Sequence, residues 1–569
     1  MKLKYLKINN YRSIESLEWE GIGELNCLIG DGDSGKTSIL EAIHLLLYPS
    51  YKFPFEETDF KDLNLDNPIS IEGFFILDSD SPLLSENKYG LYLKGLKSDG
   101  KIRDEGPKDE DKKGIQVQLT CDESFEPKWT VVGPTQERGF SIKDRQLFQM
   151  LFIGSSVSQR DFSWSKGSPL LTDSTNYDDI KAAQLDIVRK AKEGALGSNK
   201  LENFEISDAL TKELSRLGVK QATSTLSAGI DINAISANLN EISIHENNIP
   251  FRRKGLGSQR IFSIISQILN HKSGLVLIDE LELGLDPGRL QQLLKMVSHE
   301  SDVQFFFTTH SPLVVKELEA ESLCHVVSGR LFPFNSVQDI DSIRGPIRTN
   351  PEAVFTRKII VCEGPTEIGI CRGLNKQLSD TNNLSFTASG VGIANGNGSN
   401  IERVAKAFLA MGYKVAVFMD SDVPSNVPSE DTCQTFRWKE GLNTEQAVFE
   451  DITDSGVKNI LQILNDAYTE ESLDKHLNGE RFEAFLVKSQ FTQEDRRKLS
   501  TLTKNYEGSQ KGMGKGAFKM ISMGEKLGKA IFEDMPFAAL INNKENEHLH
   551  DTLKCLMNWA HNKDNVIGD

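Results

Sequence analysis

A glycine-rich turn near the start of the chain has the residues of a phosphate-binding loop. The run GDGDSGKT, from Gly30 to Thr37, fits the pattern GxxxxGK[ST] and lies between a strand-like and a helix-like segment. Glycines let backbone N–H groups approach phosphate oxygens, a lysine adds positive charge, and a hydroxyl can ligate Mg²⁺. The sequence therefore predicts a site for ATP with Mg²⁺. Its predicted contact residues are Gly30, Asp33, Ser34, Gly35, Lys36, Thr37 and Ser38.

Two carboxylates and a histidine follow at the ends of two further apolar runs. The run LVLIDE ends with Asp279 and Glu280, and FFFTTHSP carries His310 after its apolar residues. We expect Asp279 to hold Mg²⁺ and Glu280 to orient or deprotonate the attacking water. A buried strand that ends in two acids is otherwise costly, which favours a functional role.

The order of these motifs resembles that of ABC-type ATPases. LELGLDP directly follows the acid pair, and GLGSQR, residues 255–260, is similar to a degenerate ABC signature that contains Gly257. Leu256 or Gly255 stands where that signature usually has serine, and no glutamine loop is identified. The resemblance implies a dimer with two composite sites and a role for His310 in responding to the state of the nucleotide. The departure from the usual signature predicts either slow hydrolysis or ATP acting chiefly as a switch. Arg12 in NNYRSI resembles an arginine near the nucleotide in SMC- and RecF-like proteins.

A second set of carboxylates lies in the carboxyl-terminal half. KIIVCEGPTE carries Glu363 at a strand end and Glu367 four residues on, and VAVFMDSD ends with Asp420 and Asp422. Alternate residues of an extended segment share a side, so both aspartates can face one cation. Converging carboxylates suit a hard cation such as Mg²⁺ or Mn²⁺. The arrangement resembles the Toprim pattern over roughly 358–430 and predicts metal-dependent phosphoryl transfer.

An ABC-type ATPase fused to a Toprim domain resembles the OLD (overcoming lysogenization defect) family of nucleases, which includes the nuclease subunit of the Gabija antiphage system. Primases would carry a zinc ribbon, and topoisomerases a different ATPase. The resemblance implies a two-metal nuclease, whose further ligands would be Glu367 and Glu445, with Glu450 less favoured. It also implies a catalytic lysine within QKGMGKGAFKMI. The candidates, in order of preference, are Lys515, Lys519 and Lys511.

The strand-like and helix-like segments that carry these residues predict an α/β protein. Apolar runs such as ELNCLIG alternate with helix-like segments, and SILEAIHLLLY is apolar on nearly every face, so we expect that helix to be buried. We predict an ABC-type ATPase domain over 1–345 with a helical dimerisation insertion at about 178–245. A Rossmann-like Toprim domain with a C-terminal helical and basic extension follows over 352–569. The Pro- and Gly-containing stretch near 344–351 is the predicted boundary.

Composition limits the alternatives. The 569 residues include 65 basic and 82 acidic ones, and a net charge of −17 excludes a generally basic nucleic-acid coat. No long apolar run or signal-like start is present, which predicts neither a membrane span nor export. Seven scattered cysteines without CxxC suit a reducing cytosol. The range from Arg496 to Lys529 contains nine basic and two acidic residues. This local excess of positive charge suits contacts with phosphate groups.

Together these features predict a cytoplasmic, ATP-binding, divalent-metal-dependent DNA endonuclease that forms a homodimer or a higher homo-oligomer. Nucleotide state in the ATPase half is expected to regulate the Toprim half. The family resemblance alone implies antiphage defence and a helicase-type partner protein. Two alternatives remain open: an SMC/RecF-like ATPase clamp on DNA with a non-cleaving Toprim domain, and an RNA-processing Toprim nuclease.

Overall fold

The computed structural model divides the chain into two compact units, Met1–Leu331 and Phe332–Asp569. Each unit is described by itself below. No helix in the described part of the chain is both long and apolar enough to cross a membrane. The structure describes residues 1–50, 52–163, 206–219, 226–230, 242–271, 273–300, 302–381, 383–421, 432–438, 441–477, 479–507, 516–534 and 548–561.

A six-stranded sheet positions the motifs of the first unit. Its order is β10-β14-β15-β3-β16-β17, and the first five strands run parallel. The strands are β3 (Leu25–Ile29), β10 (Met150–Ile153), β14 (Gly274–Ile278), β15 (Val303–Thr308), β16 (Leu323–Val327) and β17 (Arg330–Pro333). Because parallel strands end at one edge of a sheet, the glycine-rich turn after β3, the acid pair after β14 and His310 after β15 share that edge.

Helix α1 (Lys36–Leu46) packs between this sheet and a second, antiparallel one. The second sheet runs β2-β1-β4-β7-β5-β6, with β8 and β9 beside β7. Its strands are β1 (Lys2–Tyr11), β2 (Ile14–Glu20), β4 (Ile69–Ile76), β5 (Lys94–Leu96), β6 (Ile102–Arg103), β7 (Lys112–Cys121), β8 (Lys128–Val132) and β9 (Glu137–Gly139). Ile39, Ile43 and Leu46 of α1 are fully buried in the core shared with both sheets. The predicted burial of this helix is confirmed.

The range predicted to be a helical insertion is only partly helical where it is described. It contains α4 (Asp208–Arg216) but also β11 (Leu226–Ile230) and most of β12 (Ile242–Glu246), which forms a three-stranded sheet with β11 and β13 (Ile249–Pro250). In β12 the apolar Ile242 and Ile244 alternate with polar residues, the period of a strand. Other helices among the described residues of this unit are α2 (Ile142–Gln146), α5 (Leu256–Leu269), α6 (Pro287–His299) and α7 (Pro312–Glu317).

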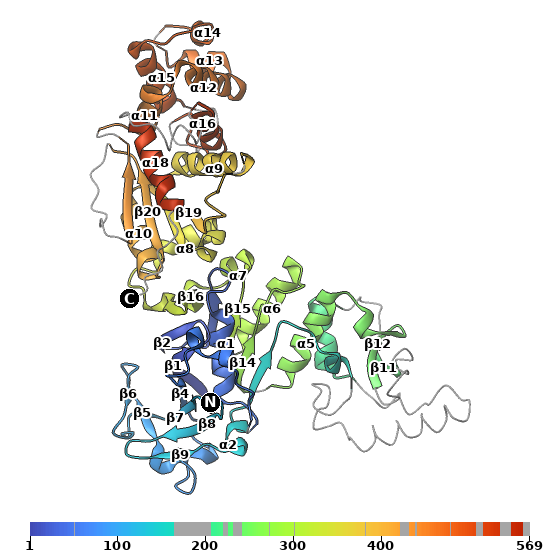
Figure 1. Ribbon diagram of the computed structural model, residues 1–569. Helices are drawn as coiled ribbons and strands as arrows, with labels where there is room; N and C mark the ends of the chain where they lie inside the picture. Colours follow the sequence, from blue (N-terminus) through green and yellow to red (C-terminus); the bar gives the residue numbers. More distant parts are fainter. Residues whose placement is uncertain are drawn as a thin grey trace. The chain divides into compact units, whose positions relative to one another are not determined.

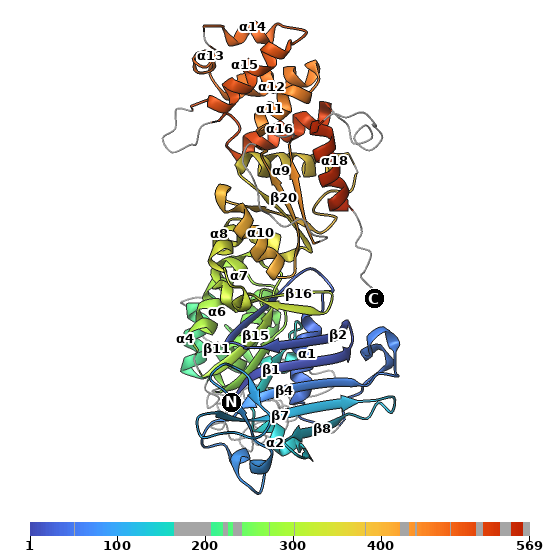
Figure 2. The ribbon, with the colours of Figure 1, turned by 90° about the vertical axis from the view of Figure 1, so that its left-hand side faces the viewer.

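The second unit is built on a four-stranded parallel sheet of order β19-β18-β20-β21. These strands are β18 (Lys358–Cys362), β19 (Val391–Asn395), β20 (Lys414–Met419) and β21 (Cys433–Arg437). Its helices are α8 (Asp341–Thr349), α9 (Pro365–Asp380), α10 (Ile401–Ala410), α11 (Thr444–Asp451), α12 (Asp454–Ala467), α13 (Glu470–Asp474), α14 (Phe482–Leu486), α15 (Gln493–Asn505), α16 (Ile521–Asp534) and α18 (His548–His561). Figures 1 and 2 show α12 to α15 clustered together, with α9 between this cluster and the sheet.

The unit boundary differs from the predicted one. The Pro- and Gly-containing stretch is not a linker, because Pro346 lies inside α8, whose Ile343 and Ile347 are buried. Just before α8, Asp339 forms a two-bond ion pair with Arg403 of α10, with N···O distances of 2.7 and 2.9 Å. Packing and this pair place the stretch within the second unit, which begins at Phe332 rather than at 352.

Candidate nucleotide and phosphoryl-transfer sites

The glycine-rich turn of the first unit has the backbone shape of a phosphate cradle. Gly30 and Gly35 have φ angles of 144° and 105°, which side-chain-bearing residues rarely adopt. A Cβ on Gly30 would collide with the Val326 carbonyl oxygen. The Lys36 ammonium folds over the loop and donates to the carbonyl oxygens of Gly30 (3.2 Å) and Asp31 (2.5 Å). Of the other predicted contacts, Asp33 and Ser34 lie in the loop and Ser38 in the first turn of α1.

Asp279 of the predicted acid pair contacts Thr37 at the end of the glycine-rich turn. Oδ1 of Asp279 accepts hydrogen bonds from Oγ1 of Thr37 at 3.1 Å and from Oγ1 of Thr308 at 2.7 Å. The backbone N–H of Glu280 donates to Oγ1 of Thr308 at 2.8 Å. Glu280 has a φ of 51°, an uncommon conformation for a residue with a side chain, and such strain concentrates at functional sites.

Glu282 fixes the end of β15 and was not predicted. Its carboxylate accepts from Oγ1 of Thr309 (2.7 Å) and from the backbone N–H of His310 (2.6 Å). Burial, and then the charge of Lys36, lower the pKa of His310, so its imidazole is neutral at pH 7. The sequence feature that could have identified Glu282 is the run DELEL, in which Glu282 lies two residues after Glu280.

The signature-like segment packs directly on the loop after the acid pair. A Cβ on Gly257 would collide with the carbonyl oxygen of Gly284, so this contact needs glycine. The preceding Leu256 is 73% exposed at the start of α5. Arg12, expected near the nucleotide, pairs with Asp59 at 2.9 Å and with Glu41 of α1, and the next residue, Ser13, lies against Gly35 of the glycine-rich turn.

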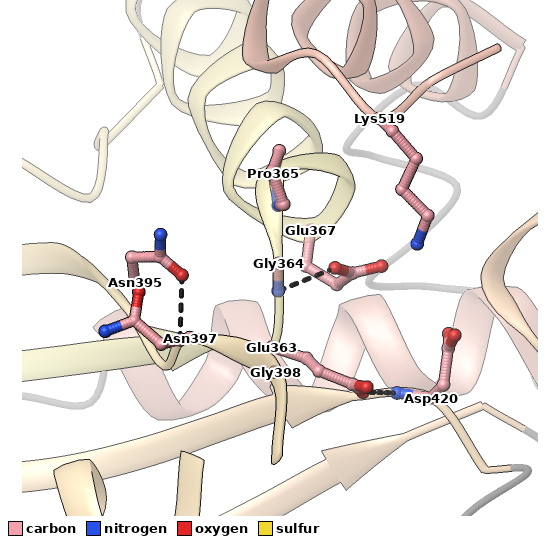
Figure 3. Close-up of a pocket in the computed structure, with 9 residues that line it drawn as sticks. All are labelled: Glu363, Gly364, Pro365, Glu367, Asn395, Asn397, Gly398, Asp420 and Lys519. Atoms are coloured by element: carbon pink, nitrogen blue, oxygen red, sulfur yellow. Dashed lines mark hydrogen bonds between the residues drawn. The ribbon is translucent and has the colours of Figure 1, made fainter. Parts of the chain in front are cut away.

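The second unit has a pocket of about 300 Å³ where its parallel strands end (Figure 3). Glu363 directly follows β18 and Asp420 directly follows β20, and the Asp420 N–H donates to Oε2 of Glu363 at 3.0 Å. Glu367, in the first turn of α9, accepts from the Gly364 N–H at 3.0 Å. The lining residues are Glu363, Gly364, Pro365, Glu367, Asn395, Asn397, Gly398, Asp420 and Lys519.

Thr444 links two of these carboxylates and was not predicted. Its Oγ1 lies 2.8 Å from Oε1 of Glu367 and 2.6 Å from Oδ1 of Asp420, and it accepts from Nε1 of Trp438 at 2.8 Å. A hydroxyl has one hydrogen, so it can donate to only one carboxylate. The other contact is a hydrogen bond if Glu367 keeps its proton. Burial, and then the charge of Asp420, raise the pKa of Glu367 to about 7, which fits this arrangement.

Glu445 lies beside Thr444 at the start of α11 and is buried. Burial raises its pKa, and its Oε1 has no hydrogen-bond partner among the described residues. An unpartnered buried carboxylate oxygen is unusual and needs a reason such as a bound ion. Glu450, the less favoured candidate, is exposed on the same helix and does not line the pocket.

Among the described residues, Lys519 is the lysine that lines the pocket. Figure 3 shows its side chain reaching toward the carboxylates of Glu367 and Asp420. Burial by itself would lower the pKa of Lys519, but the surrounding carboxylates outweigh it and raise that pKa. These carboxylates are Glu367, Glu445, Asp420 and Glu363. Lys515 and Lys511, the first and third lysine candidates, and Asp422 lie outside the described residues.

Two pairs of glycines place Lys519 opposite Glu367. In α9 and α16, Gly369 meets Gly524 and Gly373 meets Gly528 so closely that a Cβ on either member would collide with the other helix. Oγ1 of Thr366 also donates to the carbonyl oxygen of residue 518 at 3.1 Å, next to Lys519. The close approach of the helices therefore sets the position of the lysine.

We expect Gly369→Ala to lower the free energy of unfolding of the second unit by about 1–3 kcal/mol, because the added methyl group overpacks the contact with α16. Urea unfolding measures this change. Gly345→Ala is the matched control. That glycine is exposed in α8, and the nearest side-chain atom would be 3.7 Å from its Cβ. Equal unfolding curves for the two variants would contradict the role of the glycine pairs.

The pocket's donors suit an oxygen-seeking divalent cation. They are carboxylates and amides. Glu445 is not among the lining residues, but its buried Oε1 has no hydrogen-bond partner among the described residues. Within the described residues no three acidic, histidine or cysteine side chains are grouped to hold one ion. A complete ligand set would have to draw on Asp422, which is outside those residues.

Three segments of the chain match known families. Residues 354–422 match "Overcoming lysogenization defect protein-like, TOPRIM domain". Residues 1–124 match "AAA ATPase domain", and residues 220–316 match "AAA domain, putative AbiEii toxin, Type IV TA system". A comparison with curated proteins found no match.

Three solved structures that are similar to the chain each align with 58% of it. The SMC head domain from Thermotoga maritima is 13% identical, with 99% of that chain covered and a TM-score of 0.31. The Smc head domain bound to the C-terminal domain of ScpA, from Pyrococcus furiosus, is 12% identical (94% covered, TM-score 0.34). The recombination mediator protein RecF is 14% identical (97% covered, TM-score 0.34). Matches to AAA ATPase domains and, after them, to an OLD-like Toprim domain on one chain support an OLD-family ATPase–Toprim fusion.

Proposed function

We propose that this protein is an ATP-binding, divalent-metal-dependent DNA endonuclease whose active site is the pocket of the second unit. The observation that carries the proposal is the meeting of three carboxylates and Lys519 in one cavity at the carboxyl ends of parallel strands. Glu363, Glu367 and Asp420 supply the negative charge there, and Lys519 supplies a positive charge. Such a set suits hydrolysis of a phosphodiester, a reaction in which charge on phosphate oxygens must be stabilised.

Each group has a proposed task. Glu363, Glu367, Asp420 and Glu445 would hold Mg²⁺ or Mn²⁺ together with Asp422. When bound, these cations would stabilise charge on the oxygens of the scissile phosphate. Lys519 would bind a non-bridging oxygen of the same phosphate. Thr444 would orient Glu367 and Asp420 through its hydroxyl, which lies within 2.8 Å of both.

The first unit would bind ATP and regulate cleavage. Lys36 and the N-terminal turn of α1 would hold the phosphates, and Thr37 with Asp279 would hold Mg²⁺. Glu280 and His310 would respond to the terminal phosphate. The exposed Leu256 and the segment around Gly257 would face a second copy in a homodimer or larger homo-oligomer. All seven cysteines are free thiols, which suits a cytoplasmic protein. Antiphage defence, with a helicase-type partner, is the proposed role.

A plasmid-nicking assay over metals and pH tests the proposal. We expect nicking of supercoiled DNA with Mg²⁺ or Mn²⁺ and none after chelation. Because the pKa of Glu367 is raised to about 7, its carboxyl is protonated below that pH, and a cation must displace the proton. The metal concentration for half-maximal nicking should therefore rise roughly tenfold from pH 8 to pH 6.

Three outcomes separate the alternatives. A half-maximal metal concentration that stays constant between pH 6 and pH 8 would contradict the role of Glu367. DNA left intact under every metal, with and without ATP, would favour a non-cleaving DNA clamp. Preferential cleavage of RNA in a mixture of both substrates would favour an RNA-processing nuclease.

A further inference from the structure

Two cations on the exposed face of α15, Arg497 and Lys504, have no structural task. Both side chains are exposed, and neither forms an ion pair with any residue in the described ranges. They are seven residues apart, which is close to two helical turns, so they lie on one face about 10 Å from each other along the axis. An acidic chain thus displays, in a row on one helix, two cations that have no ion-pair partner among the described residues.

The neighbouring cations of α15, unlike Arg497 and Lys504, form ion pairs with acidic side chains. Arg496 donates to Asp454 and to the carbonyl oxygen of Phe449, both at 2.8 Å, which ties α15 to α11 and α12. Lys498 pairs with Glu480 at 2.5 Å and with Glu494 at 3.2 Å. Lys498 thus pairs with Glu494 at the helix start, and Asp495 beside it pairs with Lys488. The row of Arg497 and Lys504 keeps its positive charge.

The row of Arg497 and Lys504 extends along α15 toward the pocket. The carboxyl-terminal end of α15 is joined to the segment that carries Lys519, because the Ala517 N–H donates to the carbonyl oxygen of Thr503 at 2.6 Å. Lys504 is close enough to Glu445 for its charge to act on that carboxyl. Arg497, Lys504 and Lys519 therefore form a line of positive charge that ends among the pocket's carboxylates.

We propose that this line, the α15 track, binds the phosphate backbone of DNA and leads it into the pocket. The inference rests on the proposed nuclease function and adds the path of the substrate to it. Arg497 and Lys504 are spaced by about the axial rise of three base pairs, so each can reach a separate phosphate. Carboxylates line the pocket itself and repel a polyanion, so the binding charge has to lie beside it, as the α15 track does.

The test measures binding apart from cleavage. A fluorescent 30-base-pair duplex is titrated with the full-length chain carrying Glu363→Gln, over salt concentrations from 50 to 200 mM. We expect Arg497→Gln and Lys504→Gln each to weaken binding about 3–10-fold, and the slope of log K against log salt to fall by about 0.9 per lost contact. In the otherwise wild-type chain, both variants should raise KM and leave kcat unchanged.

Lys498→Gln is the matched control, since it removes the same charge one residue along α15 and should alter neither affinity nor slope. If Arg497→Gln and Lys504→Gln bind DNA like Lys498→Gln while the wild-type chain cleaves it, the α15 track is wrong and the nuclease proposal stands. If both variants weaken binding but the wild-type chain cleaves no DNA, the track stands and the nuclease proposal fails. Absence of both binding and cleavage overturns both proposals, and tighter binding of an RNA duplex of the same sequence overturns DNA as the occupant.

Discussion

Glu363→Gln is expected to abolish metal-dependent nicking, with a loss of about 10³-fold or more. The substitution removes a negative charge from the end of β18, where a cation would bind. It keeps an oxygen that can still accept the hydrogen bond from the Asp420 N–H, so the strand ends should stay in place. Rates of supercoiled-plasmid nicking at saturating Mn²⁺ measure the loss. Thermal unfolding should show a midpoint close to that of the wild-type chain.

Two control variants test whether the loss of nicking is specific to Glu363. Glu450→Gln makes the same chemical change at an exposed glutamate of α11 and should leave nicking unchanged. Lys36→Ala should weaken ATP binding strongly, because it removes the ammonium over the glycine-rich turn, whereas Glu363→Gln should leave ATP binding intact. Nicking retained by Glu363→Gln would refute the assignment of the pocket as the nuclease site.

The strand-end residues could be predicted from the sequence because each motif is local. A buried strand, a short turn and a helix start are encoded within about ten residues, as in KIIVCEGPTE and LVLIDE. The parallel sheet then brings Glu363 and Asp420 together, although 57 positions separate them in the chain. The α/β fold class and the family followed from these local signals and are confirmed.

Other parts of the site depend on packing between distant segments. Strand β19 was missed because GVGIANG is rich in glycine, yet its end supplies Asn395 to the pocket. The hydroxyl of Thr444 has its task only once α11 lies against Glu367 and Asp420. The close approach of Gly369 to Gly524 joins helices whose glycines are ordinary in sequence and visible as a pair only in the fold.

The place of Lys519 in the pocket likewise depends on packing between distant segments, and its substitution is the second change with a large expected effect. Lys519→Met is expected to lower kcat for nicking about 10²–10³-fold, because it removes the ammonium that would stabilise charge at the cleaved phosphate. The concentration of Mn²⁺ for half-maximal activity should fall, since the lost ammonium lies among four carboxylates and competes with a cation for them. Lower kcat with tighter metal binding is a combination that general misfolding would not produce.

Lys515→Met provides the comparison, because Lys515 was the first choice from the glycine-rich run and lies four residues before Lys519. Lys519→Arg keeps the charge on a longer, planar group and should recover part of the activity. The contact between Thr366 and residue 518 holds the backbone next to Lys519, which lines the pocket. Loss of nicking in Lys515→Met together with full activity in Lys519→Met would reverse this assignment, and the Lys519 ammonium would then only balance charge among the carboxylates.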